Sequence, residues 1–209
     1  MQLKEMTVTA FIEELGSNSP APGGGSVAAL NAAQAAALFG MVATLTVGNQ
    51  KYEAAHEEMK GYIAELQEYQ KHFTDMIDKD ANAFNGVFAA FKMPKETDEE
   101  KKARSAKIQE EYKKAANVPF SVGMDTLKLL PYAEPLLERG NQSAVTDVGV
   151  GLLALRLAVI GAFYNVKINL GSIKDEAFVA EKRAQMAEAL EEMERTVDTL
   201  LQKVETSLA

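Results

Sequence analysis

Hydrophobic residues recur with a helical period along most of the chain, and one long stretch carries no charge. Residues Gly16 to Gln50 contain no Asp, Glu, Lys or Arg, although these residues make up 25% of the chain. The stretch opens with a Pro-Ala-Pro-Gly-Gly-Gly turn, after which Ser26 is a plausible N-cap for a helix that continues to Val47. A helix that is apolar on all sides belongs in the middle of a protein or in a membrane.

A second nearly charge-free helix is predicted to begin at Ser143 or Val145 and to continue to Leu170. Both helices carry Gly and Ala at intervals of three or four residues, for example Ala28, Ala32 and Ala36 in the first helix. Rows of such small side chains let another helix approach closely. We therefore expect the two apolar helices to pack against each other.

Amphipathic patterns predict the other helices, and no sustained β alternation appears. Their expected ranges are Thr9–Leu15, 52–91, 101–116 after a capping box at Thr97, 120–130 after Pro119, and 174–208 after Ser172 as the cap. The last helix keeps a seam that fits either an intramolecular cover or a helix–helix dimer. The sequence predicts an all-α, single-domain helical bundle over residues 1–209, built on the two apolar helices.

Asp80 interrupts the apolar stripe of its own predicted helix, between Phe73 and Phe84. A carboxylate that faces a core must find a partner or lose its hydration, and either outcome shifts its pKa. Two interpretations stay open at this point. Asp80 is either a structural group bonded to the backbone or to a basic residue, or a functional acid.

The composition excludes several classes of function. A formal net charge of −8 argues against a nucleic-acid-binding surface, and the absence of Cys excludes disulfides and thiolate chemistry. The N-terminus lacks the features of a secretion signal, so we expect a cytoplasmic protein. The first apolar helix is long enough to span a bilayer, but Asn31 and Gln34 interrupt it and no Trp or Tyr belt flanks it. No contact with a membrane is predicted.

Familiar metal and nucleotide motifs are missing. His56 and His72 have no second ligand at a suitable spacing, so they are predicted to be surface residues and no metal site is expected. The run Gly23-Gly24-Gly25-Ser26 lacks the Lys of a phosphate-binding P-loop. A glycine-rich turn that enters a helix still exposes N–H groups to a ligand, although it serves equally well as a tight turn before a closely packed helix.

Three other polar residues lie in the second apolar helix. Asp147 falls in its first turn, where the helix dipole favours an acid. Asn165 and Asn169 lie one turn apart near its other end, and their amides must be satisfied by the backbone or by a ligand.

Five motifs, in order along nearly the whole chain, resemble the cyclodeaminase domain of the formiminotransferase-cyclodeaminase family, which includes stand-alone bacterial methenyltetrahydrofolate cyclohydrolases. The motifs are Ala21-Pro22-Gly23-Gly24-Gly25-Ser26-Val27-Ala28-Ala29, the pentad Asp80–Phe84, Pro94-Lys95 with Glu99-Glu100-Lys101 and Arg104, Gly140-Asn141 with Asp147, and Gly161–Leu170. The resemblance implies an all-helical homodimer with folate-binding clefts near the subunit interface. It also implies no metal and no tightly bound cofactor.

The resemblance further implies one reaction on a tetrahydrofolate derivative. The expected reaction is the hydrolytic interconversion of 5,10-methenyl- and 10-formyl-tetrahydrofolate, and the alternative is ring closure of 5-formimino-tetrahydrofolate with loss of ammonia. The catalytic aspartate of the family falls on Asp80, which would act as general acid/base. The residues expected to contact the substrate are Gly23, Gly24, Gly25, Ser26, Lys51, Asn141, Asp147, Asn165 and Asn169.

Among these residues, the glycine turn and Asn141 would supply backbone and amide contacts. Asp147 would accept from the pterin amino group or orient a partner, and Lys51 would help to neutralise the glutamate tail. A third possibility, from another class, is a non-catalytic helical dimer that binds a folate or another protein.

Overall fold

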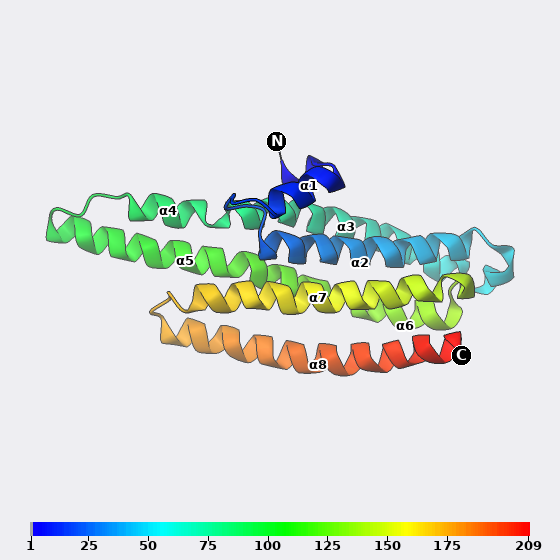
Figure 1. Ribbon diagram of the computed structural model, residues 1–209. Coiled ribbons are helices and arrows are strands. Elements are labelled where there is room, and N and C mark those ends of the chain that lie inside the picture. Colours follow the sequence, from blue (N-terminus) through cyan, green and yellow to red (C-terminus); the bar gives the residue numbers. More distant parts are fainter. Residues whose placement is uncertain (1) are drawn as a thin grey trace.

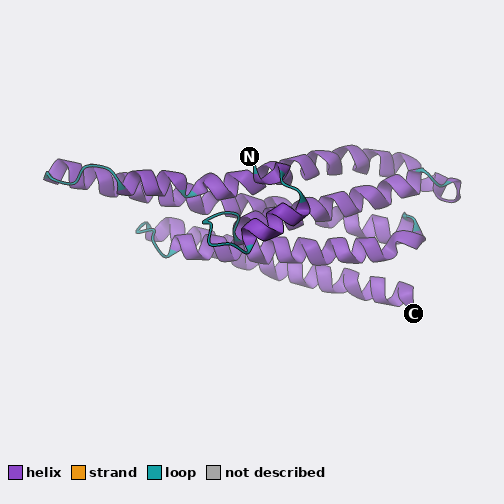
Figure 2. Cartoon of the chain, turned by 45° about the horizontal axis from the view of Figure 1, so that its top comes forward, coloured by secondary structure: helices purple, strands orange, loops and turns teal. Residues whose placement is uncertain are grey.

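The computed structural model describes residues 2–209, and no strand occurs among them (Figure 2). Long helices run side by side and are joined by short loops (Figures 1 and 2). In chain order the helices, with η marking 3₁₀ turns, are η1 (Leu3–Glu5), α1 (Val8–Leu15), α2 (Gly24–Val47), η2 (Gln50–Ala55), α3 (His56–Ala83), α4 (Asn85–Phe91), α5 (Asp98–Leu127), α6 (Leu130–Arg139), η3 (Gln142–Ala144), α7 (Val145–Leu170) and α8 (Glu176–Leu208). The all-α, single-domain prediction is confirmed.

α2 lies between α3 and α7, and it runs antiparallel to α7 (Figure 1). Small residues set how closely these helices approach. A Cβ on Gly151 would lie 2.5 Å from the Phe39 ring, and one on Gly161 would lie 3.5 Å from Ala28. α5 packs on α7 and α3, and the buried seam of α8 covers α7 and α6. The last helix is therefore an intramolecular cover in this chain.

Two segments are long and apolar enough to cross a membrane when length and composition alone are considered. They are Gly24–Val47 and Gln142–Leu170, and 50% and 56% of their respective apolar windows are buried inside the structure. The core helix of a soluble protein has the same length and composition. The expected absence of membrane contact stays a prediction.

Two predicted helix caps are wrong. Gly23 is the N-cap of α2, and Ser26 lies inside the first turn, where its buried hydroxyl donates to the Ile77 carbonyl of α3 at 3.0 Å. The cap of α8 is Asp175 rather than Ser172, since the Asp175 carboxylate accepts from the Phe178 N–H at 3.0 Å.

The predicted helix over residues 52–91 is also wrong, because the chain forms η2, α3 and α4 with a break at Phe84. Gly86 follows this break and meets Glu111 of α5, whose carboxylate oxygen would lie 2.1 Å from a Cβ on Gly86. The two helices predicted at 101–116 and 120–130 are a single helix, α5, with Pro119 inside it. The capping box at Thr97 is confirmed.

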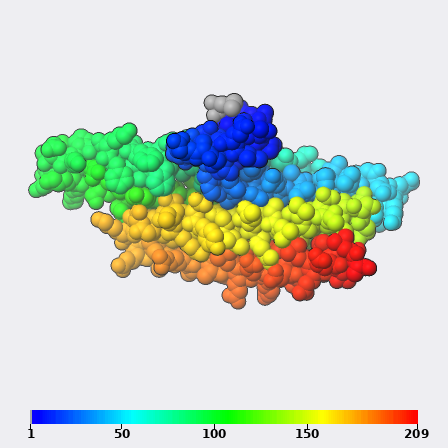
Figure 3. Space-filling model, in the orientation of Figure 1, coloured from blue at the N-terminus to red at the C-terminus, as the bar shows by residue number. Residues whose placement is uncertain are grey.

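α2 begins part-way along α3, so that α4 and the first half of α5 extend beyond it (Figure 1). We call residues 85–112 the arm. It projects from the body of the molecule at the left of Figure 3, where α4 packs against α5. The candidate site lies where the arm extends past the first turn of α2.

The close approach of α2 and α7 predicts that Gly151→Ala destabilises the protein. The added methyl group would press on the Phe39 ring, which is fully buried, so the free energy of unfolding should fall by about 1–3 kcal/mol. Gly61→Ala in α3 is the control, because no atom lies within 4 Å of its Cβ position. It should be neutral or stabilise by up to about 1 kcal/mol. Chemical denaturation measures both variants, and unchanged stability of Gly151→Ala would contradict this packing.

Candidate functional site

Three helices meet at the first turn of α2. Asp80 comes from the last turn of α3, and Asn165 comes from α7. A Cβ on Gly25 would lie 2.2 Å from both carboxylate oxygens of Asp80, while one on Gly24 would lie 3.5 Å from the Asn165 amide nitrogen. The carboxylate thus rests on the backbone of α2, and only glycine allows that approach. Since neither glycine has a positive φ, the requirement is space rather than backbone conformation.

The surroundings of Asp80 shift its protonation equilibrium upward. Burial raises the pKa of the Asp80 carboxyl from 3.8 to about 6, and a hydrogen bond from the Ser26 backbone N–H opposes this in part. No ion pair within residues 2–209 includes Asp80. The carboxylate lies at the positive end of the α2 dipole, which also favours its ionised form. An acid that is partly buried, unpaired and close to neutrality suits proton transfer.

The two asparagines of α7 donate to backbone carbonyls. The Asn165 amide donates to the Gly161 carbonyl at 2.9 Å, and the Asn169 amide donates to the Asn165 carbonyl at 2.9 Å and to the Ala115 carbonyl at 3.4 Å. Ala115 stands four residues before Pro119, which has no N–H, so this carbonyl lacks its normal helical partner. Asn169 therefore supports the proline-containing helix, and Asn165 lies beside the glycine turn.

Three of the candidate residues lie at the opposite end of α2, about 34 Å from its first turn at 1.5 Å per residue. Lys51 is exposed in η2, where its amine lies 5.3 Å from the Tyr52 ring. Asn141 caps η3 through its side chain, and its N–H donates to Thr46 at 2.9 Å. Asp147 lies in the first turn of α7.

One chain therefore brings Asp80 to the turn formed by Gly23, Gly24, Gly25 and Ser26, with Asn165 beside it. Asn169 is connected to this group only through its bond to the Asn165 carbonyl. Lys51, Asn141 and Asp147 stand apart from this group.

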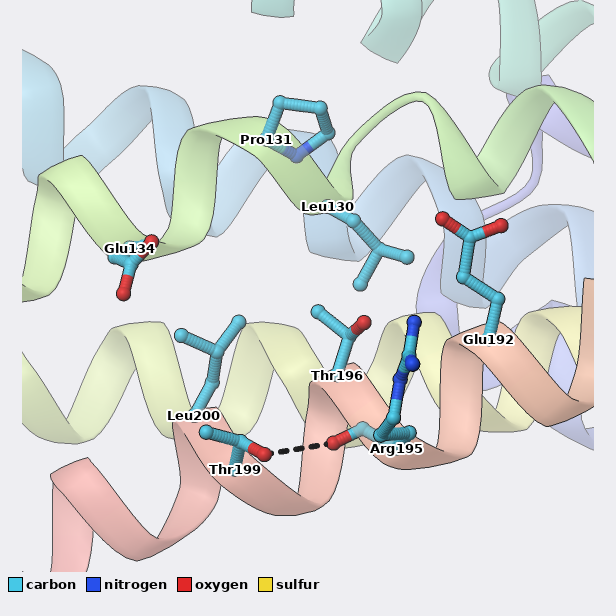
Figure 4. Close-up of a pocket in the computed structure, with 8 residues that line it drawn as sticks. All are labelled: Leu130, Pro131, Glu134, Glu192, Arg195, Thr196, Thr199 and Leu200. Atoms are coloured by element: carbon cyan, nitrogen blue, oxygen red, sulfur yellow. Dashed lines mark hydrogen bonds between the residues drawn. The ribbon is translucent and has the colours of Figure 1, made fainter.

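A groove elsewhere on the molecule contains none of the predicted site residues. It lies between α6 and α8 and is drawn in Figure 4, where the Thr199 hydroxyl donates to the Arg195 carbonyl at 2.9 Å. The lining residues are Leu130, Pro131, Glu134, Glu192, Arg195, Thr196, Thr199 and Leu200. The groove therefore lies apart from Asp80 and the glycine turn.

Both histidines contact polar groups of the chain. His56 bonds the Asn49 carbonyl at 3.1 Å, and His72 lies 3.1 Å from the Asp125 carboxylate. Within residues 2–209, no three His, Asp or Glu side chains gather in an arrangement that could hold a metal ion. The expected absence of a metal remains a prediction.

Sequence reasoning missed a group of exposed aromatic residues beside Asp80. Phe84, Phe88 and Phe91 belong to the hydrophobic pattern of the helix predicted over residues 52–91, yet they are 37%, 56% and 47% exposed. Their rings connect with Tyr112 of α5. The glycine turn was the signal that could have revealed them. A helix that starts at this turn, beside Asp80, cannot cover the phenylalanines that follow Asp80 in the chain.

A sequence profile of a known family spans most of the chain. The formiminotransferase-cyclodeaminase profile matches residues 7–188. The chain belongs to the formiminotransferase-cyclodeaminase family. The family resemblance inferred from the five motifs is thus confirmed.

Relatives in the family include both stand-alone and longer proteins. The chain is 36% identical over 202 residues to the methenyltetrahydrofolate cyclohydrolase of Methylorubrum extorquens, with 95% of this chain and 97% of that protein covered. It is also 36% identical over 199 residues to the formimidoyltransferase-cyclodeaminase of Sus scrofa, of which it spans only 37%. The crystal structure of formiminotetrahydrofolate cyclodeaminase from Thermotoga maritima is similar over 99% of this chain and 98% of that chain, with a TM-score of 0.80 and 29% identity.

The raised pKa predicts a pH-dependent effect of Asp80→Asn on stability. The folded state binds the Asp80 proton more tightly than the unfolded state, so the wild-type chain loses stability as pH rises from 3.8 to about 6. The variant has no such loss and should be more stable than the wild type by about 2–3 kcal/mol at pH 7.5. Denaturation at pH 3.5 and pH 7.5 measures the difference. A variant less stable than the wild type at pH 7.5 would contradict the desolvated state of Asp80.

Proposed function

We propose that the protein is a methenyltetrahydrofolate cyclohydrolase, an enzyme that interconverts 5,10-methenyl- and 10-formyl-tetrahydrofolate. The observation that carries the proposal is the Asp80 carboxylate, which lies unpaired on the first turn of α2 with a pKa of about 6. The similarity to the Methylorubrum extorquens protein extends over nearly the full length of both chains and supports this reaction.

In the proposed mechanism, ionised Asp80 takes a proton from a water molecule as the water oxygen bonds to the carbon between N5 and N10. The tetrahedral carbon then forms its carbonyl as the bond to N5 breaks. Protonated Asp80 returns a proton to N5, and the hydroxyl proton leaves to solvent, which balances the reaction. A pKa near 6 lets one carboxyl perform both transfers near neutral pH.

The first turn of α2 would position the substrate. The first N–H groups of a helix have no partner within the helix, and Gly24 and Gly25 supply two of them beside Asp80. They would donate to an oxygen of the folate. Asn165 would contact the same end of the substrate, while Asn169 would hold α5 and α7 in register behind it.

Cyclodeamination is the second candidate reaction. It also passes through a tetrahedral carbon between N5 and N10, but ammonia leaves, so protonated Asp80 would donate to the departing nitrogen. The similarity to the Thermotoga maritima protein, which is named as a formiminotetrahydrofolate cyclodeaminase, supports this alternative.

We propose that the active form is a homodimer joined through α2 and α7. α7 exposes an apolar row along its length, and the adjacent α2 adds two more apolar residues. Stable interfaces bury about 800 Å² per partner, and large side chains that are 39–76% exposed supply an area of that order. These residues are Val150, Leu153, Leu157, Tyr164 and Ile168 of α7, with Met41 and Leu45 of α2.

The charges at the ends of this face favour an antiparallel pair. Asp147 and Lys167 stand ten residues on either side of Leu157. Two copies related by a two-fold axis near Leu157 would place opposite charges at the same height, whereas parallel copies would place like charges there. The antiparallel pair would also bring Lys51, Asn141 and Asp147 of one copy toward Asp80 of the other.

Replacing the Asp80 carboxylate tests the chemistry. Asp80→Asn should lower turnover by about two to four orders of magnitude, since general acid–base catalysis contributes that much. Loss of the near-ultraviolet absorbance of methenyl-tetrahydrofolate reports hydrolysis, and its appearance from formimino-tetrahydrofolate reports cyclodeamination. For wild-type hydrolysis, kcat/KM should rise with pH through about 6 as Asp80 ionises. Asp98→Asn, at an exposed acid on the arm, is the control.

Two outcomes would count against this proposal. Turnover at the wild-type rate by a folded Asp80→Asn variant would show that Asp80 takes no part in the reaction. If the wild-type chain changes neither substrate at high concentration, the protein is a binding or interaction module instead.

The dimer predicts that Leu157→Glu separates the subunits. A carboxylate at the centre of an apolar interface would lose its hydration without a partner, so light scattering should show the mass of one chain. Leu208→Glu, at an exposed apolar residue near the end of α8, should stay dimeric. A wild-type chain that is monomeric and fully active would contradict the shared site.

A further inference from the structure

The apolar stripe of α3 continues beyond the helix that covers it. Ile77 and Asp80 face the first turn of α2, through the bond from Ser26 and the contact with Gly25. α2 begins at Gly24, so the next turn along α3 has no α2 side chains to pack against. Phe84, the C-cap residue that follows α3, is 37% exposed. The exposed aromatic surface therefore starts one helical turn from the carboxylate.

Four aromatic rings make this surface continuous. The centroids of Phe84 and Phe88 are 5.7 Å apart, those of Phe84 and Tyr112 are 6.0 Å apart, and those of Phe91 and Tyr112 are 6.4 Å apart. Each pair meets edge to face, at 60–85°. We call these four residues the aromatic row. Edge-to-face contacts fix ring orientations, so the row presents a prearranged surface for a further aromatic ring.

A cation ends the row on the side away from Asp80. The Arg104 guanidinium donates from Nε and Nη2 to the Phe91 carbonyl at 3.2 and 3.1 Å, and its carbon lies 5.4 Å from the centroid of the Phe91 ring. No ion pair within residues 2–209 includes Arg104. Its remaining N–H groups can bind a carboxylate from a ligand.

We propose that the aromatic row binds the p-aminobenzoyl ring of the folate and that Arg104 binds its glutamate carboxylate. The inference rests on the proposed function and assigns the part of the substrate beyond the reacting carbon. In a folate, N10 joins the reacting carbon to an aryl ring, and the glutamate is attached at the far end of that ring. Asp80, the aromatic row and Arg104 follow one another along the arm in this same order.

The distances along the arm agree with this assignment. Asp80 and Phe84 are one turn apart, so a carbon held at the carboxylate leaves the attached aryl ring beside the first phenylalanine. Phe91 stands eleven residues after Asp80, a separation that would span about 16 Å in a continuous helix at 1.5 Å per residue. Lys51, the cation expected to neutralise the glutamate, is at the opposite end of α2 in the same chain. Arg104 is the alternative cation that this chain itself provides.

Binding of two ligands separates the roles of the ring and the carboxylate. The probes are 5-formyltetrahydrofolate, which does not turn over by the proposed reaction, and 5-formyltetrahydropteroate, which lacks the glutamate. Phe88→Ala should weaken the binding of both ligands about tenfold, because a stacking surface is lost in each case. Arg104→Gln should weaken only the glutamate-bearing ligand, also about tenfold. Calorimetry on the full chain measures six dissociation constants, two for the wild type and two for each variant.

Matched variants control for indirect effects. Lys102→Gln removes an exposed cation two residues from Arg104, and Leu208→Ala removes an exposed apolar side chain near the end of α8. Neither should change binding. In turnover, Phe88→Ala and Arg104→Gln should raise KM about tenfold and leave kcat within about twofold, since these groups bind equally in the ground and transition states.

Three results would overturn the inference. Unchanged affinity for both ligands in Phe88→Ala would show that the aromatic row does not bind the aryl ring. Equal losses for the two ligands in Arg104→Gln would show that Arg104 does not bind the glutamate carboxylate. A fall in molecular mass in Phe88→Ala would show instead that the row contacts a second copy. If the wild-type protein turns over a folate while the variants bind normally, only this inference fails. If the wild type turns over no folate, the proposed function fails.

Discussion

The candidate site depends on the contact between the Asp80 carboxylate and the first turn of α2. Gly25 makes it possible, because any larger residue would occupy the position of the carboxylate oxygens. Burial disfavours the charge, while the Ser26 N–H and the helix dipole favour it, and the result is a pKa of about 6. The Ser26 hydroxyl bond to α3 holds the two helices at this distance. Packing and acid–base chemistry therefore share the same few atoms.

The starting point of α2 has a second consequence. Because the helix begins beside Asp80, it leaves the following turns of α3 and α4 uncovered, and their aromatic residues remain exposed next to the acid. The candidate site therefore lies where α2 begins and the aromatic residues beyond it remain exposed. An elongated substrate would meet a carboxyl group at one end of this site and an apolar surface beside it. The glycine turn contributes backbone N–H groups to the same place.

The sequence predicted those features that depend on local patterns. Helical periodicity identified Asp80, the absence of charge identified α2 and α7, and the spacing at Thr97 identified the start of α5. Features that depend on distant partners were missed. The Ser26 hydroxyl donates to the Ile77 carbonyl, 51 residues away. α5 continues through Pro119, and the Asn169 amide of α7 donates to the Ala115 carbonyl, which the proline leaves without a helical partner. The separation of Lys51 from Asp80 likewise depends on which end of α2 meets Asp80, and spacing along the chain does not reveal that.

The most direct test of this account is the pKa of Asp80 itself. Carboxyl-carbon NMR of protein labelled at its aspartates follows each side chain through a pH titration, and Asp80→Asn identifies the resonance by its loss. The account predicts a midpoint of about 6 for Asp80 in the folded chain. A midpoint of about 4 or below, the ordinary range of an exposed or ion-paired aspartate, would contradict it.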